Sequence, residues 1–575
     1  MKTQDDPTEE KPTTPVPASG GVAEQSTPLG ASEFNKMESD LKKQPTPRGG
    51  AAFVAAGIFL SRLAGLVRVR VFAHYFGNSA PADAYNAALK IPNFMQNLFG
   101  EGILSASFIP VYARLLGEKN DIEADRVAGV IATLLAIVAS TLSLIGVFLT
   151  PLMIDLIAPG FEGETKALTI QLVQILFPAM AFLIMSAWCL GVLNSHRRFF
   201  LSYVAPVIWN FSIIGSLVMF SQKSLPELAK TAAWGLVLGS VLQFAVQLPT
   251  VLKLAPHLKL RLETKSKNVR TVLTSFSSVV LARGVVQISA YIDNVLASWL
   301  PVGAVSALSY AQTIYLLPVS LFGMSVSAAS LAEMAREQGG VAESEDASLK
   351  LREQVNRGLK QIAFFIVPSV CAFVFLGDVG VSALYQSGRF SDTDVKHVWF
   401  TLAGSSVGLL ATTLGRLYSS TFYALQDPKS PLRFAIVRVI LTTVLGYIGG
   451  VLLPGWLGID RMWGTVGLTA TAGISGWVEF MLLRRGLNAR VGHTGVPTSF
   501  VAKLWAAALV SMAFGWGAKI LWVQLVINHQ SSVLRALKAF VVFGVYGAIY
   551  LLMTLIFKIP QSQALLSKIK RRAGR

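Results

Sequence analysis

Residues 61–68 read Ser-Arg-Leu-Ala-Gly-Leu-Val-Arg and lie within an apolar run that extends from residue 51 to residue 76. A second apolar run, 82–110, follows after a short Gly-Asn-Ser-Ala-Pro turn. Each run is long enough to cross a bilayer as a helix. Both nevertheless contain charged residues, and a charge at the bilayer centre is costly unless it faces a polar cavity. We therefore expect this helical hairpin to form one wall of a polar chamber within a membrane.

The composition supports a membrane protein over the whole chain. Of the 575 residues, 53% are hydrophobic and only 14% are charged, whereas a soluble domain has about 25% charged residues. Apolar runs of roughly 20 residues recur without the short alternating segments of a β-barrel. The sequence therefore predicts an all-α polytopic membrane protein with about fourteen transmembrane helices. The expected spans are 51–76, 82–110, 127–156, 167–194, 199–220, 231–252, 271–299, 303–335, 358–386, 397–424, 432–453, 463–483, 500–524 and 536–557.

The distribution of Lys and Arg predicts the orientation. With the N-terminus inside, the cytoplasmic segments hold 34 of the 50 basic residues and the opposite loops hold 7. This asymmetry follows the positive-inside rule and places both termini in the cytoplasm. We attribute the net charge of +18 to this topology and not to a nucleic-acid partner.

One internal similarity suggests a repeat. Leu-Phe-Gly at 98–100 recurs at 321–323, an offset of 223 residues, and small residues follow in both places. The second and eighth spans then become equivalents, which implies two pseudo-symmetric six-helix lobes and two extra helices, and transporters commonly bind substrate between such halves. The expected division is a disordered cytoplasmic tail (1–48), an N-terminal lobe (49–256), a C-terminal lobe (257–486), and two extra helices with a basic cytoplasmic tail (487–575).

The first span places two arginines in the expected chamber. Arg62 is about eleven residues into the span, or roughly 16 Å at the helical rise, which is near the bilayer midplane. Arg68 follows six residues later, about 120° around an ideal helix. Gly65 lies between them and would allow a bend that brings both guanidinium groups toward one cavity. For Arg70 we favour a position at the membrane interface.

The second span carries a polar face. Lys90, Asn93, Asn97 and Glu101 recur at helical spacing, which places them on one side of a helix. An interhelical hydrogen-bond seam would explain such a face, but two charges among four residues favour the wall of a water-filled chamber. Asp83 lies near the outer end, where pairing with Arg68 would help to close that side.

The second half of the chain contributes Arg283 and Arg416 within the seventh and tenth spans. The chamber is then net cationic, and guanidinium groups bind phosphate oxygens in pairs, which suits a diphosphate. No nucleotide-binding, zinc-protease or metal-cluster motif occurs, and Cys189 and Cys371 lie alone within spans. We expect transport without enzymatic activity, cofactor or metal, and the coupling ion or membrane potential that would drive it is not identified.

Several motifs occur in the order of one family. They are Ser-Arg-Leu-Ala-Gly-Leu-Val-Arg (61–68), Ala-Asp-Ala-Tyr (82–85), Lys-Ile-Pro-Asn (90–93), Phe-Gly-Glu-Gly (99–102), Gln-Ser-Gly-Arg-Phe (386–390) and Phe-Tyr-Ala-Leu-Gln-Asp-Pro-Lys-Ser-Pro (422–431). The chain resembles the MurJ/MviN family of lipid II flippases, members of the multidrug/oligosaccharidyl-lipid/polysaccharide exporter superfamily. The resemblance covers about residues 51–560.

The resemblance implies that the chain moves the undecaprenyl-diphosphate-linked peptidoglycan precursor, lipid II, from the cytoplasmic to the periplasmic leaflet of the bacterial inner membrane. By the same resemblance Arg62 and Arg68 are cavity arginines, and Asp83 and Glu101 are gate residues. The lipid tail would lie along helices at about 500–557. Implied partners are lipid II and membrane lipids, with cell-wall synthases as a further candidate.

Two positions depart from the family pattern. Gln96 and Thr313 stand where well-studied members carry cavity arginines. We hypothesise that Arg283, together with Arg416, partly substitutes for them, because a diphosphate still has to be neutralised. An Arg283→Ala variant is therefore expected to lose lipid II transport, and full activity in a transport assay would contradict the hypothesis.

Two alternatives stay open. One is a flippase for another polyprenyl-linked oligosaccharide, which the missing cations would allow. The other is a scaffold for cell-wall synthases without transport. A drug antiporter that extrudes cations is disfavoured, because the embedded charges are mostly positive.

Overall fold

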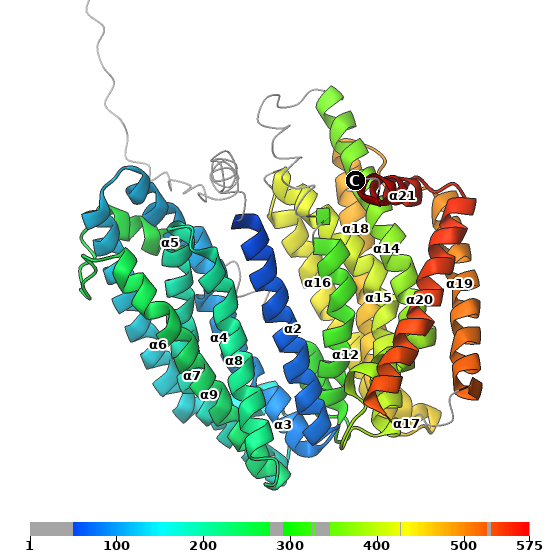
Figure 1. Cartoon of the computed structure of the whole chain (residues 1–575), viewed down its shortest axis with the longest axis horizontal. Coiled ribbons are helices and arrows are strands. Elements are labelled where there is room, and N and C mark those ends of the chain that lie inside the picture. Colours follow the sequence, from blue (N-terminus) through cyan, green and yellow to red (C-terminus); the bar gives the residue numbers. More distant parts are fainter. Residues whose placement is uncertain are drawn as a thin grey trace, which may run out of the picture.

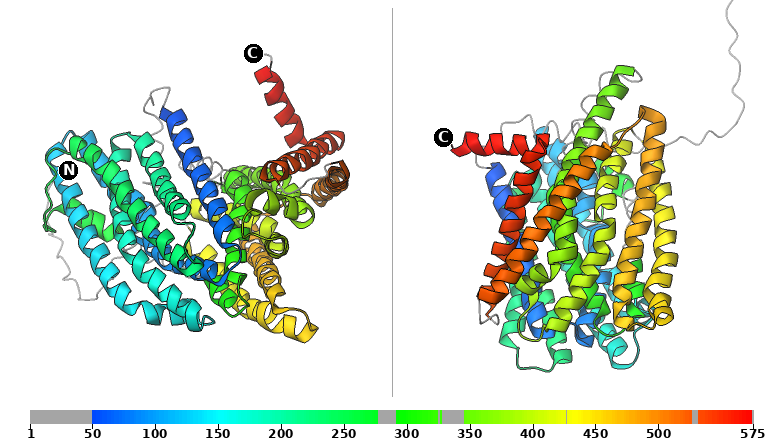
Figure 2. Two further views of the ribbon diagram at one scale, coloured as in Figure 1. Left: turned by 60° about the horizontal axis from the view of Figure 1, so that its bottom comes forward. Right: turned by 90° about the vertical axis from the view of Figure 1, so that its right-hand side faces the viewer.

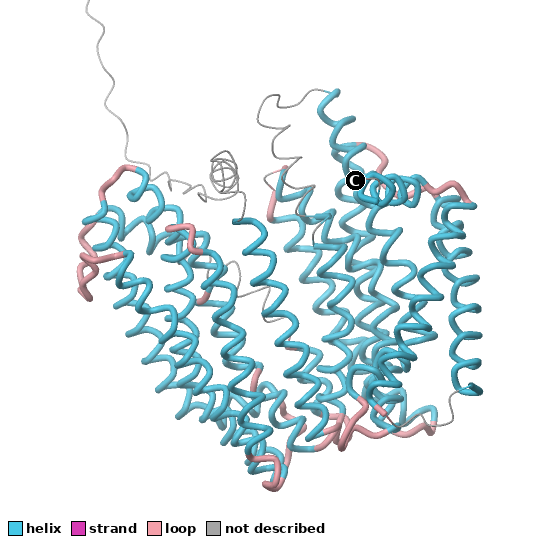
Figure 3. The backbone as a smooth tube through the Cα atoms, viewed as in Figure 1, coloured by secondary structure: helices cyan, strands magenta, loops and turns pink. Residues whose placement is uncertain are grey.

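The computed structural model describes residues 50–276, 291–324, 326–327, 345–425, 427–525 and 531–573. Within these ranges the chain is helical and contains no strand (Figure 3). The expected tail at 1–48 and Arg283 lie outside the described residues.

The described helices follow one another along the chain. They are α2 (Gly50–Phe76), α3 (Ala80–Ala88), α4 (Lys90–Phe99), α5 (Glu101–Gly117), α6 (Asp121–Ile157), α7 (Gly163–Ser195), α8 (Phe199–Met219), α9 (Leu225–Leu254), α11 (Ile292–Ser298), α12 (Ala304–Pro318), the π-helical turn η1 (Val319–Met324), α14 (Glu345–Tyr385), α15 (Asp392–Ala424), α16 (Lys429–Gly446), the π-helical turn η2 (Tyr447–Leu452), α17 (Leu453–Leu457), the 3₁₀ turn η3 (Arg461–Trp463), α18 (Gly464–Val491), α19 (Thr498–Leu525), α20 (Ser532–Ile556) and α21 (Pro560–Ala573).

The fold agrees with the expected spans. Eleven helical segments in the described residues are long and apolar enough to cross a membrane. The other three expected spans are α2, which carries three arginines, the interrupted segment α3–α5, and the seventh span, of which 277–290 is not described. The polytopic helical fold is confirmed.

The interruption of the second span supports the internal repeat. That span breaks at Gly100, between α4 and α5, and the eighth span changes to the π-helical turn η1, which contains Gly323. These two glycines are 223 residues apart, the offset seen in the sequence. Equivalent helices are therefore interrupted at equivalent places, and such irregular backbone in a membrane is tolerated where it lines a cavity or is buried in protein.

The helices form two groups that meet at one end. Helices α2–α9 pack on one another, as do α14, α15, α16 and α18. Figure 1 shows the two groups converging toward the end that carries α3 and α17 and separating toward the end that carries α21. The lobe boundary expected at 256/257 falls in the connection after α9 and stays a prediction.

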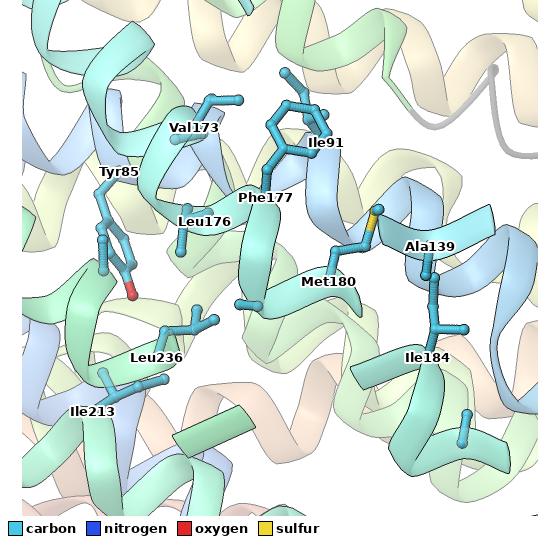
Figure 4. Close-up of a cluster of buried hydrophobic side chains, with 14 of the residues drawn as sticks. Tyr85, Ile91, Ala139, Val173, Leu176, Phe177, Met180, Ile184, Ile213 and Leu236 are labelled. Atoms are coloured by element: carbon cyan, nitrogen blue, oxygen red, sulfur yellow. The ribbon is translucent and has the colours of Figure 1, made fainter. Parts of the chain in front are cut away.

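The core of the first group centres on α7. Phe177, Met180 and Ile184 of this helix are buried against the surrounding helices, and Figure 4 shows Tyr85 and Ile91 from the second span in the same cluster. In the second group α15 and α18 approach closely through small residues: a Cβ on Gly408 would lie 2.4 Å from Gly473 Cα. Small residues at such crossings are typical of membrane helix packing.

The last three helices lie at the edge of the second group. Helices α19 and α20 pack on each other and on α14, while α21 runs across the end of the molecule (Figure 2). The basic tail expected after the last span is thus helical over Pro560–Ala573. The start of α2 and α21 lie at the same end of the molecule (Figure 1).

Candidate functional site

A polar cavity of about 190 Å³ lies where α2, α3, α4, α8 and α12 meet. It therefore draws on the first, second and fifth spans of one group and on the eighth span. Its lining residues are Arg68, Val69, Phe72, Tyr85, Asn86, Leu89, Lys90, Asn93, Trp209, Ile213, Ser309, Tyr310 and Thr313. Three residues expected in the chamber from the sequence, Arg68, Lys90 and Asn93, are brought together here.

Arg68 contributes a guanidinium group to the cavity. Its guanidinium carbon lies 4.9 Å from the centroid of the Trp209 ring, so the aromatic face supports the charge. Its Nε atom is buried and has no hydrogen-bond partner among the described residues. A buried donor without an acceptor is destabilising. An anionic ligand in the cavity would supply the missing acceptor.

Lys90 is held at the start of α4 by the facing helix α11. Its carbonyl oxygen accepts a hydrogen bond of 3.1 Å from the Tyr291 hydroxyl, and the Tyr291 ring stacks edge-on with Phe94 at 5.6 Å. The charge of Lys90 interacts with Asp293, a buried carboxylate. Asp293 is not among the residues that line the cavity, and the sequence analysis did not include it in the chamber.

The polar face of the second span is shorter than expected. Asn93 lines the cavity, and Asn97 is exposed one turn further along α4. The helix ends at Phe99 and a new helix begins at Glu101. Gly100 thus interrupts the helix between Asn97 and Glu101. Only the backbone of Glu101 is described.

Arg62 lies outside this cavity lining. Its side chain is exposed, and Nη1 donates a 3.2 Å hydrogen bond to Ser320 Oγ of η1. Helix α2 is uninterrupted from Gly50 to Phe76. Gly65 lies where α2 meets α8, since a Cβ there would be 3.9 Å from Asn210 Oδ1. Arg62 therefore bridges the first and eighth spans, beside the cavity that holds Arg68.

Arg416 also lies outside the lining of this cavity. It is exposed on α15 and interacts electrostatically with Tyr315 of α12. Arg438, which shares that interaction, pairs with Glu479 at 3.1 Å. Within the described residues no group of His, Cys, Asp and Glu could hold a metal ion.

Sequence reasoning missed the residues that α12 contributes. Ser309 Oγ donates a 3.0 Å hydrogen bond to Asn86 Oδ1, and these residues are 223 positions apart. The repeat offset, applied to Asn86, would have pointed to Ser309. Thr313, the position that departs from the family pattern, is the repeat equivalent of Lys90 and lies in the same cavity wall.

Asp83 of α3 joins the two halves at the end of the molecule where the two groups of helices converge. Its two carboxylate oxygens accept hydrogen bonds from Gly303 N at 2.6 Å, Ser306 N at 2.7 Å and Ser306 Oγ at 2.6 Å. The pairing with Arg68 that we expected is replaced by this capture of the N-terminus of α12, where a negative charge is favourable. Asp83 and Ser306 again differ by 223 residues, so equivalent positions of the two halves meet.

The backbone around Asp83 is shaped for this contact. Ser79 caps α3 by accepting from Ala82 N, and Pro81 lies in the first turn. Gly303 has φ +94°, a conformation that favours glycine, and a Cβ there would lie 2.8 Å from Asn78 O. Only glycine fits between the two helix starts without distortion.

Further contacts close the same end. Tyr310 donates from its hydroxyl to Gly77 O at 3.1 Å, Arg389 N donates to His74 O at 2.8 Å, and Arg70 Nη1 donates to Ala383 O at 2.8 Å. Arg70, for which we favoured an interfacial position, thus contacts the other half of the chain. We call these contacts and those of Asp83 the closed-end contacts.

The comparison with known proteins now decides the family. The profile described as "Lipid II flippase MurJ" matches residues 72–541. The chain belongs to the lipid II flippase MurJ family. The match covers the cavity lining except Arg68 and Val69, the closed-end contacts except that of Arg70, and the first part of α20. A MurJ-family protein is a transporter and not an enzyme.

Curated relatives agree over most of their length. The "Lipid II flippase MurJ" of Burkholderia cenocepacia is 29% identical over 465 residues, covering 80% of this chain and 87% of the relative. The "Probable lipid II flippase MurJ" of Rhizobium tropici is 30% identical over 464 residues, covering 79% and 83%.

Solved structures share the fold. "Lipid II flippase MurJ, inward closed conformation" superposes with a TM-score of 0.70 at 24% identity, covering 88% of this chain and 98% of that one. An inward-facing multidrug transporter of the MATE family and the MOP superfamily gives a TM-score of 0.56 at 17% identity. The MurJ/MATE fold is therefore the fold of this chain.

Proposed function

We propose that this chain moves lipid II across the cytoplasmic membrane and that Arg68 and Lys90 bind its diphosphate. The observation that carries the proposal is the cavity itself: two cations from different spans line a polar cavity within a transporter fold, and one of them has a buried Nε without an acceptor. A diphosphate presents several anionic oxygens, and charge-assisted hydrogen bonds to such oxygens are strong.

The neutral polar residues of the cavity complete the site. The Asn93 side-chain amide can donate hydrogen bonds to phosphate oxygens that the cations leave free, whereas the hydroxyls of Ser309 and Thr313 already donate to Asn86 Oδ1 and Ser309 O. Asp293, whose charge interacts with that of Lys90, limits the net positive charge near the site and so favours release of the lipid. The undecaprenyl tail would stay in the membrane along α19 and α20.

Translocation then requires alternating access. The closed-end contacts, with Asp83 at their centre, keep one end shut while the headgroup enters from the end that carries α21. Breaking those contacts would open the opposite end and release the headgroup there. The charge asymmetry and the common end of α2 and α21 support cytoplasmic termini, and entry would then be from the cytoplasm. Association with cell-wall synthases stays a prediction.

Complementation tests this function. The wild-type chain is expected to restore growth to bacteria depleted of their own lipid II flippase, and Arg68→Ala is expected to abolish rescue because the diphosphate loses its principal ligand. Arg461→Ala, a change of one exposed arginine in η3, serves as the matched control and should rescue normally. Membrane levels of each variant are compared by immunoblot.

The alternatives predict different patterns. Rescue that survives Arg68→Ala would indicate a scaffold without transport. A wild-type chain that reaches the membrane but fails to rescue would favour another polyprenyl-linked oligosaccharide, the alternative that Gln96 and Thr313 keep open.

A further inference from the structure

A second cavity, of about 340 Å³, lies between the ends of α14, α15, α19 and α20. It is at the end of the molecule opposite to α21 (Figure 1). Cavities of roughly 300–1,000 Å³ are typical of small-ligand sites. None of its lining residues belongs to the cavity of Arg68 and Lys90, so the proposed transport site does not account for it.

The charges in this second cavity favour an anion. Its cations are Lys396, Arg535 and Lys538, and its acids are Asp378 and Asp392. Asp378 Oδ2 is already neutralised by Lys519 Nζ at 2.6 Å, a pair that is mostly shielded from solvent. Three cations therefore face one uncompensated carboxylate.

Two buried polar atoms in this second cavity lack partners. Arg535 Nη2 donates to Ser532 Oγ at 3.3 Å, but Arg535 Nε is buried without a hydrogen-bond partner among the described residues. The same holds for Asp378 Oδ1. A ligand that satisfies both must offer an anionic acceptor to Arg535 and a donor, such as a hydroxyl, to Asp378.

The surroundings place this second cavity at a lipid headgroup layer. Trp399 and Trp522 line it, and tryptophan is enriched where membrane helices meet the headgroups. Beside Trp522, Leu521 and Leu525 are 57% and 79% exposed, and Phe540 of α20 is 79% exposed. Acyl chains can cover this apolar surface while a headgroup enters the cavity.

We propose that this cavity binds the headgroup of an anionic glycerophospholipid that carries hydroxyl groups, as phosphatidylglycerol does. The phosphate oxygens accept from Arg535 and Lys538, Lys396 lies at the exposed edge, and a glycerol hydroxyl donates to Asp378 Oδ1. Basic pockets between membrane helices bind anionic headgroups elsewhere by the same chemistry. The bound lipid would join α19 and α20 to α14 and α15.

Native mass spectrometry of the purified full-length protein tests the proposal. The detergent-solubilised chain is mixed with phosphatidylglycerol or with phosphatidylethanolamine, and the retained lipid is counted. The wild type is expected to retain phosphatidylglycerol selectively. Arg535→Gln combined with Lys538→Gln should reduce retention by about tenfold or more, since the loss of one hydrogen bond to a charged group lowers affinity by about tenfold or more. Because the readout involves no transport step, its failure is distinct from failure of the proposed function.

Matched variants keep the result interpretable. Lys223→Gln combined with Arg461→Gln removes two exposed cations in other loops and should leave retention unchanged. Lys396→Glu changes an exposed side chain, so it should lower retention without affecting folding. Equal retention of phosphatidylglycerol by the wild type and the Arg535/Lys538 variant would overturn the proposal. So would a loss of retention in the Lys223/Arg461 control as large as that in the Arg535/Lys538 variant. Complete displacement by millimolar inorganic phosphate would also overturn it, by indicating a site for free phosphate.

Discussion

Lys90→Gln is expected to lower lipid II translocation by about 10- to 100-fold. Lys90 is one of two cations in the cavity, and a hydrogen bond to a charged group contributes about 1.5–3 kcal/mol, where 1.4 kcal/mol corresponds to tenfold. The loss should be larger than for substitution of a neutral cavity residue, because the substitution also removes the positive charge that interacts with the buried Asp293. Translocation is measured in proteoliposomes that contain purified protein and labelled lipid II.

The conservative variant separates charge from packing. Lys90→Arg retains the charge and should recover most of the activity, whereas a purely structural role would make the longer side chain as harmful as glutamine. Wild-type activity in Lys90→Gln would contradict the assignment of the cavity. Lys253→Gln, at the end of α9, provides a control for loss of one positive charge.

Asp83→Ala is expected to shift the protein away from the closed-end arrangement. The change removes the acceptor for Gly303 N, Ser306 N and Ser306 Oγ. Leaving even one or two buried donors unpaired costs about 2 kcal/mol or more, which corresponds to a population shift of roughly 30-fold. Transport should also fall, because the cycle needs the closed-end contacts to form and break.

Spin-label distances measure this shift. Labels at Lys223→Cys and Trp456→Cys lie on exposed positions of the two halves, and the native cysteines Cys189 and Cys371 are both buried. Asp83→Ala should add a population of longer distances. Gly303→Ala should act in the same direction without changing any charge. An unchanged distance distribution in both variants would contradict the role of Asp83, and Asp155→Ala, an exposed acid, is the control.

The apolar runs were sufficient to predict the helices. The third span, expected at 127–156, lies within Asp121–Ile157, and the fourteenth, expected at 536–557, coincides closely with Ser532–Ile556. Hydrophobic length determines such spans, because the bilayer requires a continuous apolar helix. The break at Gly100 could not be predicted in this way, because an apolar run of the right length predicts one helix whether or not its backbone is continuous.

The partners of polar residues could not be predicted from periodicity. Spacing offered Arg68 as the partner of Asp83, and the structure instead pairs Asp83 with the N-terminus of α12. The sequence analysis also expected Arg62 near the centre of the chamber, whereas Arg68 and not Arg62 lines the cavity described above. Helical spacing gives the face of one helix, whereas a partner depends on how two helices pack. The repeat offset of 223 residues was the sequence signal that contained this information.

Capture of the substrate inside the cavity tests the central proposal most directly. A photocrosslinking amino acid is placed at Thr313 in one variant and at exposed Trp456 in another, and labelled lipid II is irradiated with each protein in membranes. We predict crosslinking from Thr313 but not from Trp456, and a reduction of about tenfold when Lys90→Gln is added. Absence of crosslinking at Thr313, or crosslinking that Lys90→Gln leaves unchanged, would contradict a diphosphate site built on Arg68 and Lys90.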